Sequence, residues 1–171
     1  MRRILLAAAA CAALLAVLPA TANAADLPAP TSTAPTAGTA SGAGRPVLTG
    51  VRTGRHDGYD RAVFDFTGGT PAYRVEYGTL IEQGRGGAVP VAGASTLLVT
   101  FAGLDTPAVD LTRVYDPQLP GLRQIRSGGY FEGRASFGLG LDAHGGFRVL
   151  VLHDPDRIAV DVAQQSAPGC G

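Results

Sequence analysis

From residue 46 to residue 164 the chain is a series of short segments in which apolar and polar side chains alternate. Alternation with a period of two is typical of β-strands that bury one face, and no stretch shows the spacing of an amphipathic helix. Clusters of Gly, Pro and Asp between the segments predict turns. The predicted strands cover residues 47–53, 60–66, 72–77, 96–101, 122–126, 134–142, 147–153 and 157–162. We therefore expect one all-β domain with a two-layer core.

The alternation also predicts which side chains are buried. In the segment 60–66, Ala62, Phe64 and Phe66 fall on one face, which we assign to the core. The segment 147–152 is apolar on both faces apart from Arg148, as expected for a central strand covered on both sides. The stretch 141–153 is interpreted as a hairpin.

The segments outside this domain differ in composition. Residues 1–24 combine two arginines, an uncharged apolar run and an Ala-Asn-Ala site, which predicts a cleavable secretory signal peptide. Residues 25–45 are rich in Ala, Thr, Pro, Ser and Gly and predict a disordered linker, and 165–171 a flexible tail. We thus expect a secreted, extracytoplasmic product with no membrane span after cleavage.

Charge and cysteine content narrow the possible partners. Loss of the two leader arginines would leave 12 arginines against 14 acidic residues, a formal charge of −2, which does not favour nucleic-acid binding. Every basic residue is arginine, and with abundant Ala and Gly this is typical of GC-rich genomes. After cleavage Cys170 would be the one remaining cysteine, available for a disulfide dimer or without a role.

A short internal repeat is the most informative feature. Residues 60–66 (DRAVFDF) align with residues 156–162 (DRIAVDV), and a His-Asp pair precedes both copies. Each copy has an apolar core face, while an Arg and an Asp four positions apart lie on the outer face. If the copies occupy neighbouring strands, Arg61 could meet Asp161 and Arg157 could meet Asp65 across the sheet. Either these pairs set the strand register, or the outward arginines bind a ligand.

A set of short motifs lies along this domain: VRTG at 51–54, HDGYDR at 56–61, VFDF at 63–66, YRVEY at 73–77, LPGLR at 119–123, FGLGL at 137–141, FRV at 147–149, DPDR at 154–157 and DV at 161–162. In these motifs the domain resembles the AMIN-like domain of exported actinobacterial proteins, a relative of the AMIN domain of bacterial envelope proteins. The resemblance spans nearly the whole domain.

This resemblance implies a small antiparallel β-sandwich of two roughly symmetrical sheets without catalytic machinery. In the AMIN family such domains position envelope proteins by contacting peptidoglycan. The expected partner is therefore peptidoglycan or another wall component, and no cofactor is expected. The candidate ligand-binding residues are Arg61, Asp65, Arg157, Asp161, Arg74 and Arg123.

Two other functions remain open at this stage. A secreted protein-protein interaction module would use the two long connections, 78–94 and 102–121, or Cys170. A metal-dependent wall or peptide hydrolase would gather His56 and His153 with nearby aspartates. Against it, no nucleophile elbow and no zinc-binding spacing occur, and His, Asp and Gly are ordinary turn residues. We therefore expect no enzyme and no metal site.

Overall fold

The computed structural model of the protein describes residues 27–164. The expected signal peptide at 1–24, the expected tail at 165–171 and Cys170 lie outside the described residues. Within the described range the chain forms strands and loops and no helix. The strands are β1 (Thr36–Gly38), β2 (Val47–Arg55), β3 (Tyr59–Thr67), β4 (Ala72–Tyr77), β5 (Ser95–Ala102), β6 (Leu122–Phe131), β7 (Arg134–Leu141), β8 (Phe147–Leu152) and β9 (Arg157–Ala163).

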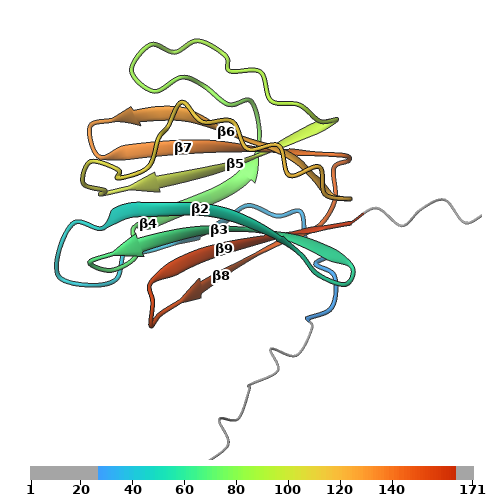
Figure 1. Ribbon diagram of the computed structural model, residues 1–171, viewed down its shortest axis with the longest axis horizontal. Coiled ribbons are helices and arrows are strands. Elements are labelled where there is room, and N and C mark those ends of the chain that lie inside the picture. Colours follow the sequence, from blue (N-terminus) through green and yellow to red (C-terminus); the bar gives the residue numbers. More distant parts are fainter. Residues whose placement is uncertain (1–26, 165–171) are drawn as a thin grey trace, which may run out of the picture.

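The strands form two antiparallel sheets that lie one above the other (Figure 1). One sheet has five strands in the order β1-β4-β5-β7-β6, and the other has four in the order β2-β3-β9-β8. The expected all-β sandwich is therefore confirmed. Each predicted strand is present, but β6 continues to Phe131, five residues beyond its predicted end, and β1 was not predicted. The other ends shift by at most two residues, because the alternation of apolar residues specifies the buried face of a strand better than its last residue.

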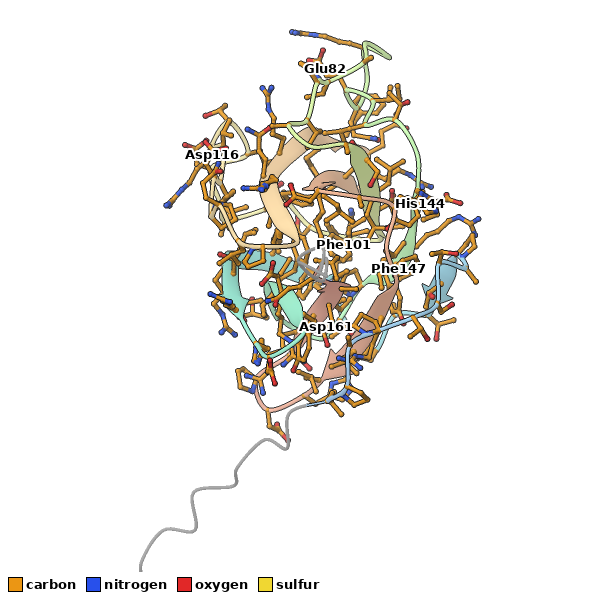
Figure 2. The ribbon with its side chains drawn as sticks, turned by 90° about the vertical axis from the view of Figure 1, so that its right-hand side faces the viewer. Glu82, Phe101, Asp116, His144, Phe147 and Asp161 are labelled. Atoms are coloured by element: carbon orange, nitrogen blue, oxygen red, sulfur yellow. The ribbon has the colours of Figure 1, made fainter. Side chains whose placement is uncertain are left out.

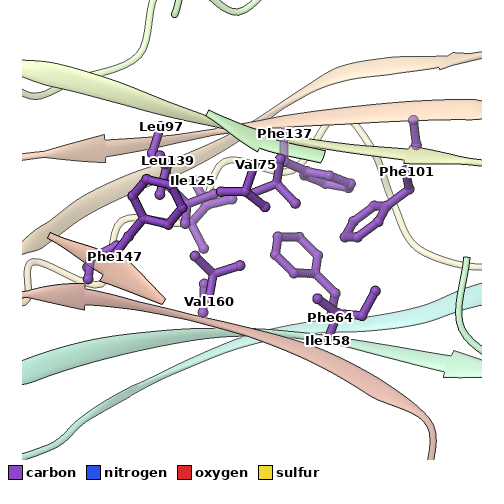
Figure 3. Close-up of a cluster of buried hydrophobic side chains, with 14 of the residues drawn as sticks. Phe64, Val75, Leu97, Phe101, Ile125, Phe137, Leu139, Phe147, Ile158 and Val160 are labelled. Atoms are coloured by element: carbon purple, nitrogen blue, oxygen red, sulfur yellow. The ribbon is translucent and has the colours of Figure 1, made fainter. Parts of the chain in front are cut away.

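The core lies between the two sheets (Figure 3). Phe64 packs its ring 5.0 Å from the ring of Phe101 and 5.0 Å from that of Phe137, so aromatic side chains join the two layers. Ala62 and Phe66 are buried on the same face of β3 as Phe64, as their alternation predicts. Packing of this kind fixes which face of β3 points outward.

The two copies of the repeat pair with each other at the centre of the four-stranded sheet. In the antiparallel register of β3 and β9, Arg61 faces Asp161, Val63 faces Ala159 and Asp65 faces Arg157. In the strand order β2-β3-β9-β8, each copy lies on a central strand, and each central strand has the other copy on one side and an edge strand on the other. The sheet is therefore pseudo-symmetric about the Val63–Ala159 pair.

Strand β8 differs from its expected position. It was expected to be central and to form a hairpin with the preceding strand, but it is an edge strand of the four-stranded sheet while β7 belongs to the other sheet. The turn residues at 143–146 let the chain cross between the layers, and turn composition does not distinguish such a crossing from a hairpin. The second apolar face of β8 consequently points outward.

Residues 27–45 also differ from the disordered linker expected there. Strand β1 pairs with β4, and the N–H of Ser41 donates to the carbonyl of Thr70 at 2.9 Å. The N–H of Phe147 donates to the carbonyl of Ser32 at 2.7 Å. Backbone hydrogen bonds hold this segment against the domain, and they do not depend on large apolar side chains.

Part of the outer face of the five-stranded sheet is covered by the connection 78–94. Leu80 is buried, and a Cβ at Gly140 would lie 1.9 Å from the carbonyl oxygen of Ala92, so only glycine permits this approach. The side-chain amide of Gln83 donates to the hydroxyl of Ser136 at 3.1 Å. The outer face of the four-stranded sheet is contacted by the segment that begins at Leu27, through the hydrogen bond from Arg148 to the carbonyl of Pro28, and it holds most of the candidate residues.

Candidate functional site

The outer face of the four-stranded sheet carries both copies of the Arg and Asp pattern. Because cross-strand partners share a face, Arg61 and Asp161 lie together at one end and Asp65 and Arg157 at the other. Four residue positions along β3 separate Arg61 from Asp65, roughly 13 Å at the usual strand rise. The sheet thus presents two related ends joined by a central strip.

At the first end, Asp161 is fully buried beneath two arginines. Nε and Nη2 of Arg61 donate to its two carboxylate oxygens at 2.6 and 3.0 Å. Nε of Arg148 donates to Oδ2 at 2.8 Å, and the side chains of Arg61 and Arg148 are only 18% and 22% exposed. The hydrogen bond to Asp161 raises the pKa of Arg61 above its ordinary value. The single carboxylate of Asp161 is therefore the ion-pair partner of two guanidinium groups.

Further contacts hold this cluster in place. The ring of Tyr59 lies against both guanidinium groups, with ring-centroid distances of 5.4 Å for Arg61 and 5.0 Å for Arg148. The same ring stacks on His56 at 4.7 Å. Nη1 of Arg148 donates to the carbonyl of Pro28 at 2.8 Å and ties residues 27–45 to the sheet. The density of these contacts indicates a structural role for this end.

At the second end, Asp65 takes a different partner from the one expected. Nε and Nη2 of Arg52, on β2, donate to its two oxygens at 2.7 and 2.8 Å, and the side chains are 56% and 25% exposed. The hydrogen bonds from Arg52 hold the pKa of Asp65 below its ordinary value, with a smaller contribution from the charge of Arg157. The expected pairing is therefore hydrogen-bonded for Arg61 and Asp161, whereas Arg157 and Asp65 are only register partners.

The side chain of Arg157 makes no side-chain hydrogen bond or ion pair in the described chain, and its Nε is buried without a hydrogen-bond partner. Leu152 faces it from β8 and Asp65 faces it from β3, where both carboxylate oxygens accept hydrogen bonds from Arg52 and the charge of Arg157 acts on Asp65 without a hydrogen bond. Guanidinium groups that are partly buried normally have hydrogen-bond partners, so the side chain of Arg157 is a candidate position for binding a ligand.

A groove of about 790 Å³ runs along this face and includes Arg157 in its wall. Residues of all four strands line it, arginines and aliphatic side chains among them, and the described residues contribute no carboxylate to the lining. The lining residues are Leu27, Arg52, Thr53, Gly54, His56, Tyr59, Arg61, Val63, Leu150, Leu152, Arg157 and Ala159. A volume of this size can hold a small ligand or a short segment of a polymer.

The other two candidate residues lie on the five-stranded sheet. Arg74, on β4, makes an exposed pair with Glu76, with Nε 2.6 Å from Oε1. Arg123, on β6, pairs with Asp142. Each pair raises the pKa of its arginine. The structure therefore brings four of the six candidates onto one face and leaves Arg74 and Arg123 apart from them.

The histidines are dispersed. His56 lies in the turn before β3 and His153 in the turn before β9, at opposite ends of the sheet, where Nδ1 of His153 lies 2.9 Å from Oδ1 of Asp156. His144 stacks on Tyr77 at 3.7 Å. Figure 2 shows Glu82 and Asp116 on separate loops away from Asp161. Among residues 27–164 no group of three or more His, Cys, Asp or Glu side chains is placed to hold a metal ion.

Sequence reasoning missed several residues of this face. Arg148 shares the carboxylate of Asp161, Arg52 takes Asp65, and Leu150 and Leu152 form part of the groove. The sequence did contain a signal for the two leucines. Residues 147–152 are apolar on both faces apart from Arg148, and an apolar outer face is expected for a strand that lines a groove as well as for a covered strand. No local pattern links Arg52 to Asp65, which lies on the next strand.

Comparison with known proteins gives one match. The family model described as the AMIN-like domain matches residues 46–164. Neither the curated proteins nor the solved structures include a match to the chain. In the described part of the chain, no helix has the length and apolar character needed to cross a membrane.

Proposed function

Because the chain belongs to the AMIN-like domain family, we propose that it is an exported, non-catalytic domain that binds peptidoglycan through the groove on its four-stranded sheet. The family indicates association with the cell wall, and the groove supplies a surface for it. The observation that carries the choice of surface is Arg157, a cation in the groove wall without a hydrogen-bond partner in the described chain.

The charge of the groove supports this choice. Peptidoglycan carries carboxylates on its peptides, and the planar guanidinium group binds a carboxylate with two parallel hydrogen bonds. Of the residues that the structure describes, three arginines and no acidic side chain line the groove. Of these, Arg52 and Arg61 already bind aspartates, so Arg157 is the arginine left for the polymer.

The proposed role requires no reacting group. His56 stacks on Tyr59, and among residues 27–164 the groove lining contains neither a second histidine nor a carboxylate that could act with it as acid or base. A binding role also agrees with the half-buried Leu150 and Leu152 in the groove wall, which can exclude water from a bound chain.

Co-sedimentation with purified sacculi tests the proposal. We expect the chain without its leader to sediment with sacculi, and Arg157→Ala to reduce the bound fraction about tenfold, as loss of a charged hydrogen bond would. Arg74→Ala is the matched control, because it removes an exposed arginine from the other sheet. If wild-type protein stays in the supernatant, or if both variants bind equally, the groove is not the wall-binding surface.

A further inference from the structure

The groove also indicates which part of a wall polymer it would take. Four arginines lie on this face, Arg52, Arg61, Arg148 and Arg157, against the two carboxylates Asp65 and Asp161, which leaves a local charge of +2. A ligand with at least one negative charge would complement it. A neutral glycan strand would not.

The position of Arg157 specifies the place of that negative charge. Arg52 uses both oxygens of Asp65, and Arg61 and Arg148 share Asp161. Arg157 is flanked across the strand by Leu152 and along its own strand by Ala159, both in the groove lining. An anion in the groove would meet the side chain of Arg157 in the groove wall rather than its buried Nε, and would bind in partly apolar surroundings, where a charged hydrogen bond is stronger than in water.

The floor beside Arg157 is aliphatic. Val63 and Ala159 face each other at its centre, where both are buried, and the half-buried Leu150 and Leu152 line the β8 side. Sugar rings are commonly bound on exposed aromatic faces, but Tyr59 already stacks on His56 and lies against two arginines. Short aliphatic side chains therefore suit this floor better than sugar rings do.

From these observations we infer that the groove binds a peptide end, with the terminal carboxylate on Arg157 and short aliphatic side chains on Leu150 and Leu152, beside the largely buried Val63. The inference rests on the proposed function and deepens it, since it assigns recognition to the peptide part of the wall polymer. A volume of about 790 Å³ accommodates two or three small residues.

Calorimetric titration of the chain without its leader distinguishes the ligand classes. The probes are N-acetyl-alanyl-alanine with a free carboxylate, the same dipeptide as its C-terminal amide, glycerol phosphate and an N-acetylglucosamine oligomer. We expect the free acid to bind at least about tenfold more tightly than the other three, because only it offers both a carboxylate and methyl groups. Equal binding of acid and amide, or tighter binding of glycerol phosphate or the oligomer, would overturn the inference.

Two variants test the residues. Arg157→Gln should lower the affinity for the acid to that for the amide while changing the free energy of unfolding by less than about 1 kcal/mol, because its charge acts on Asp65 without a hydrogen bond. Arg74→Gln, on the other sheet, should bind like the wild type. An unchanged affinity in Arg157→Gln contradicts the inference.

The two proposals can fail separately. Sacculi that retain the wild-type protein, together with no binding of the dipeptide acid, would leave the proposed function standing and remove the peptide-end assignment. Binding of the dipeptide acid without retention on sacculi would instead support the site and contradict the wall as its target.

Discussion

Asp161 and Asp65 occupy equivalent positions in the two copies of the repeat, but their surroundings differ. Asp161 is fully buried and accepts hydrogen bonds from Arg61 and Arg148. Asp65 is a quarter exposed and is bound by Arg52 alone. The cause lies in the edge strands, where Arg148 faces Asp161 whereas Gly50 faces Asp65.

The same difference decides what the two repeat arginines can do. Arg61 is held by a buried carboxylate and by the ring of Tyr59. Its counterpart Arg157 loses Asp65 to Arg52 and is left beside an aliphatic strip. An identical Arg and Asp pattern can thus produce a structural cluster at one end of a sheet and an available cation at the other.

The largest predicted effect is on stability at the buried end. Asp161→Asn leaves Arg61 and Arg148 close together without a balancing charge, and we expect a loss of about 3 kcal/mol or more in the free energy of unfolding. The matched Asp65→Asn breaks one largely exposed pair and should cost less than about 1 kcal/mol. Urea unfolding of both variants measures the difference, and similar losses would show that the two ends are energetically alike.

A second, smaller effect should distinguish the two partners of Asp161. Arg61→Ala and Arg148→Ala each leave one arginine on the carboxylate, and we expect each to cost about 2 kcal/mol. The double variant should cost more than the sum, because it leaves a buried charge without any cation. Additive losses in urea unfolding would indicate that the arginines do not act on the same carboxylate.

Hydrogen exchange adds a control to that comparison. Arg148→Ala also removes the hydrogen bond to the carbonyl of Pro28, whereas Arg61→Ala does not touch that segment. Faster exchange in residues 27–32 is therefore expected for Arg148→Ala alone. The same acceleration in both variants would mean that the segment depends on the whole cluster.

Much of this fold could be predicted from local pattern, and the reason is visible in particular residues. Ala62, Phe64 and Phe66 alternate with polar neighbours, and only one orientation of β3 buries all of them. The repeat also predicted that Arg61 lies opposite Asp161. When two copies of one pattern pair in antiparallel orientation, the Arg of one copy faces the Asp of the other.

The remaining features depend on contacts between distant segments. An apolar outer face on β8 predicts a covered strand, yet Leu150 and Leu152 line an open groove, since composition cannot say what packs above a strand. The order of residues 27–45 depends on backbone hydrogen bonds such as that between Phe147 and Ser32, which leave no trace in side-chain pattern. The pairing of Arg52 with Asp65 likewise joins residues of two different strands, so the local sequence pattern does not predict it. This pairing leaves Arg157 without a hydrogen bond to Asp65.

The smallest predicted effect concerns the exposed end and its pH dependence. The pKa of Asp65 in the folded protein lies below its ordinary value of 3.8, mainly because Arg52 donates hydrogen bonds to the carboxylate. Its contribution to stability is therefore present at pH values above about 4 and is lost as the pH falls through the lower, folded-state pKa. Asp65→Asn should reduce the fall in unfolding free energy between pH 6 and pH 3 by less than about 1 kcal/mol.

Arg52→Ala provides the control for this prediction, because it removes the same pair from the other side. It should reduce the fall by a similar amount, and the double variant should reduce it no further, since the pair can be lost only once. Urea unfolding at the two pH values, in low and high salt, gives the measurement, with a smaller difference expected in high salt. If Arg52→Ala left the pH dependence unchanged while Asp65→Asn reduced it, Arg157 would be the cation that stabilises Asp65. The two ends of the sheet would then be more alike than their hydrogen bonds indicate.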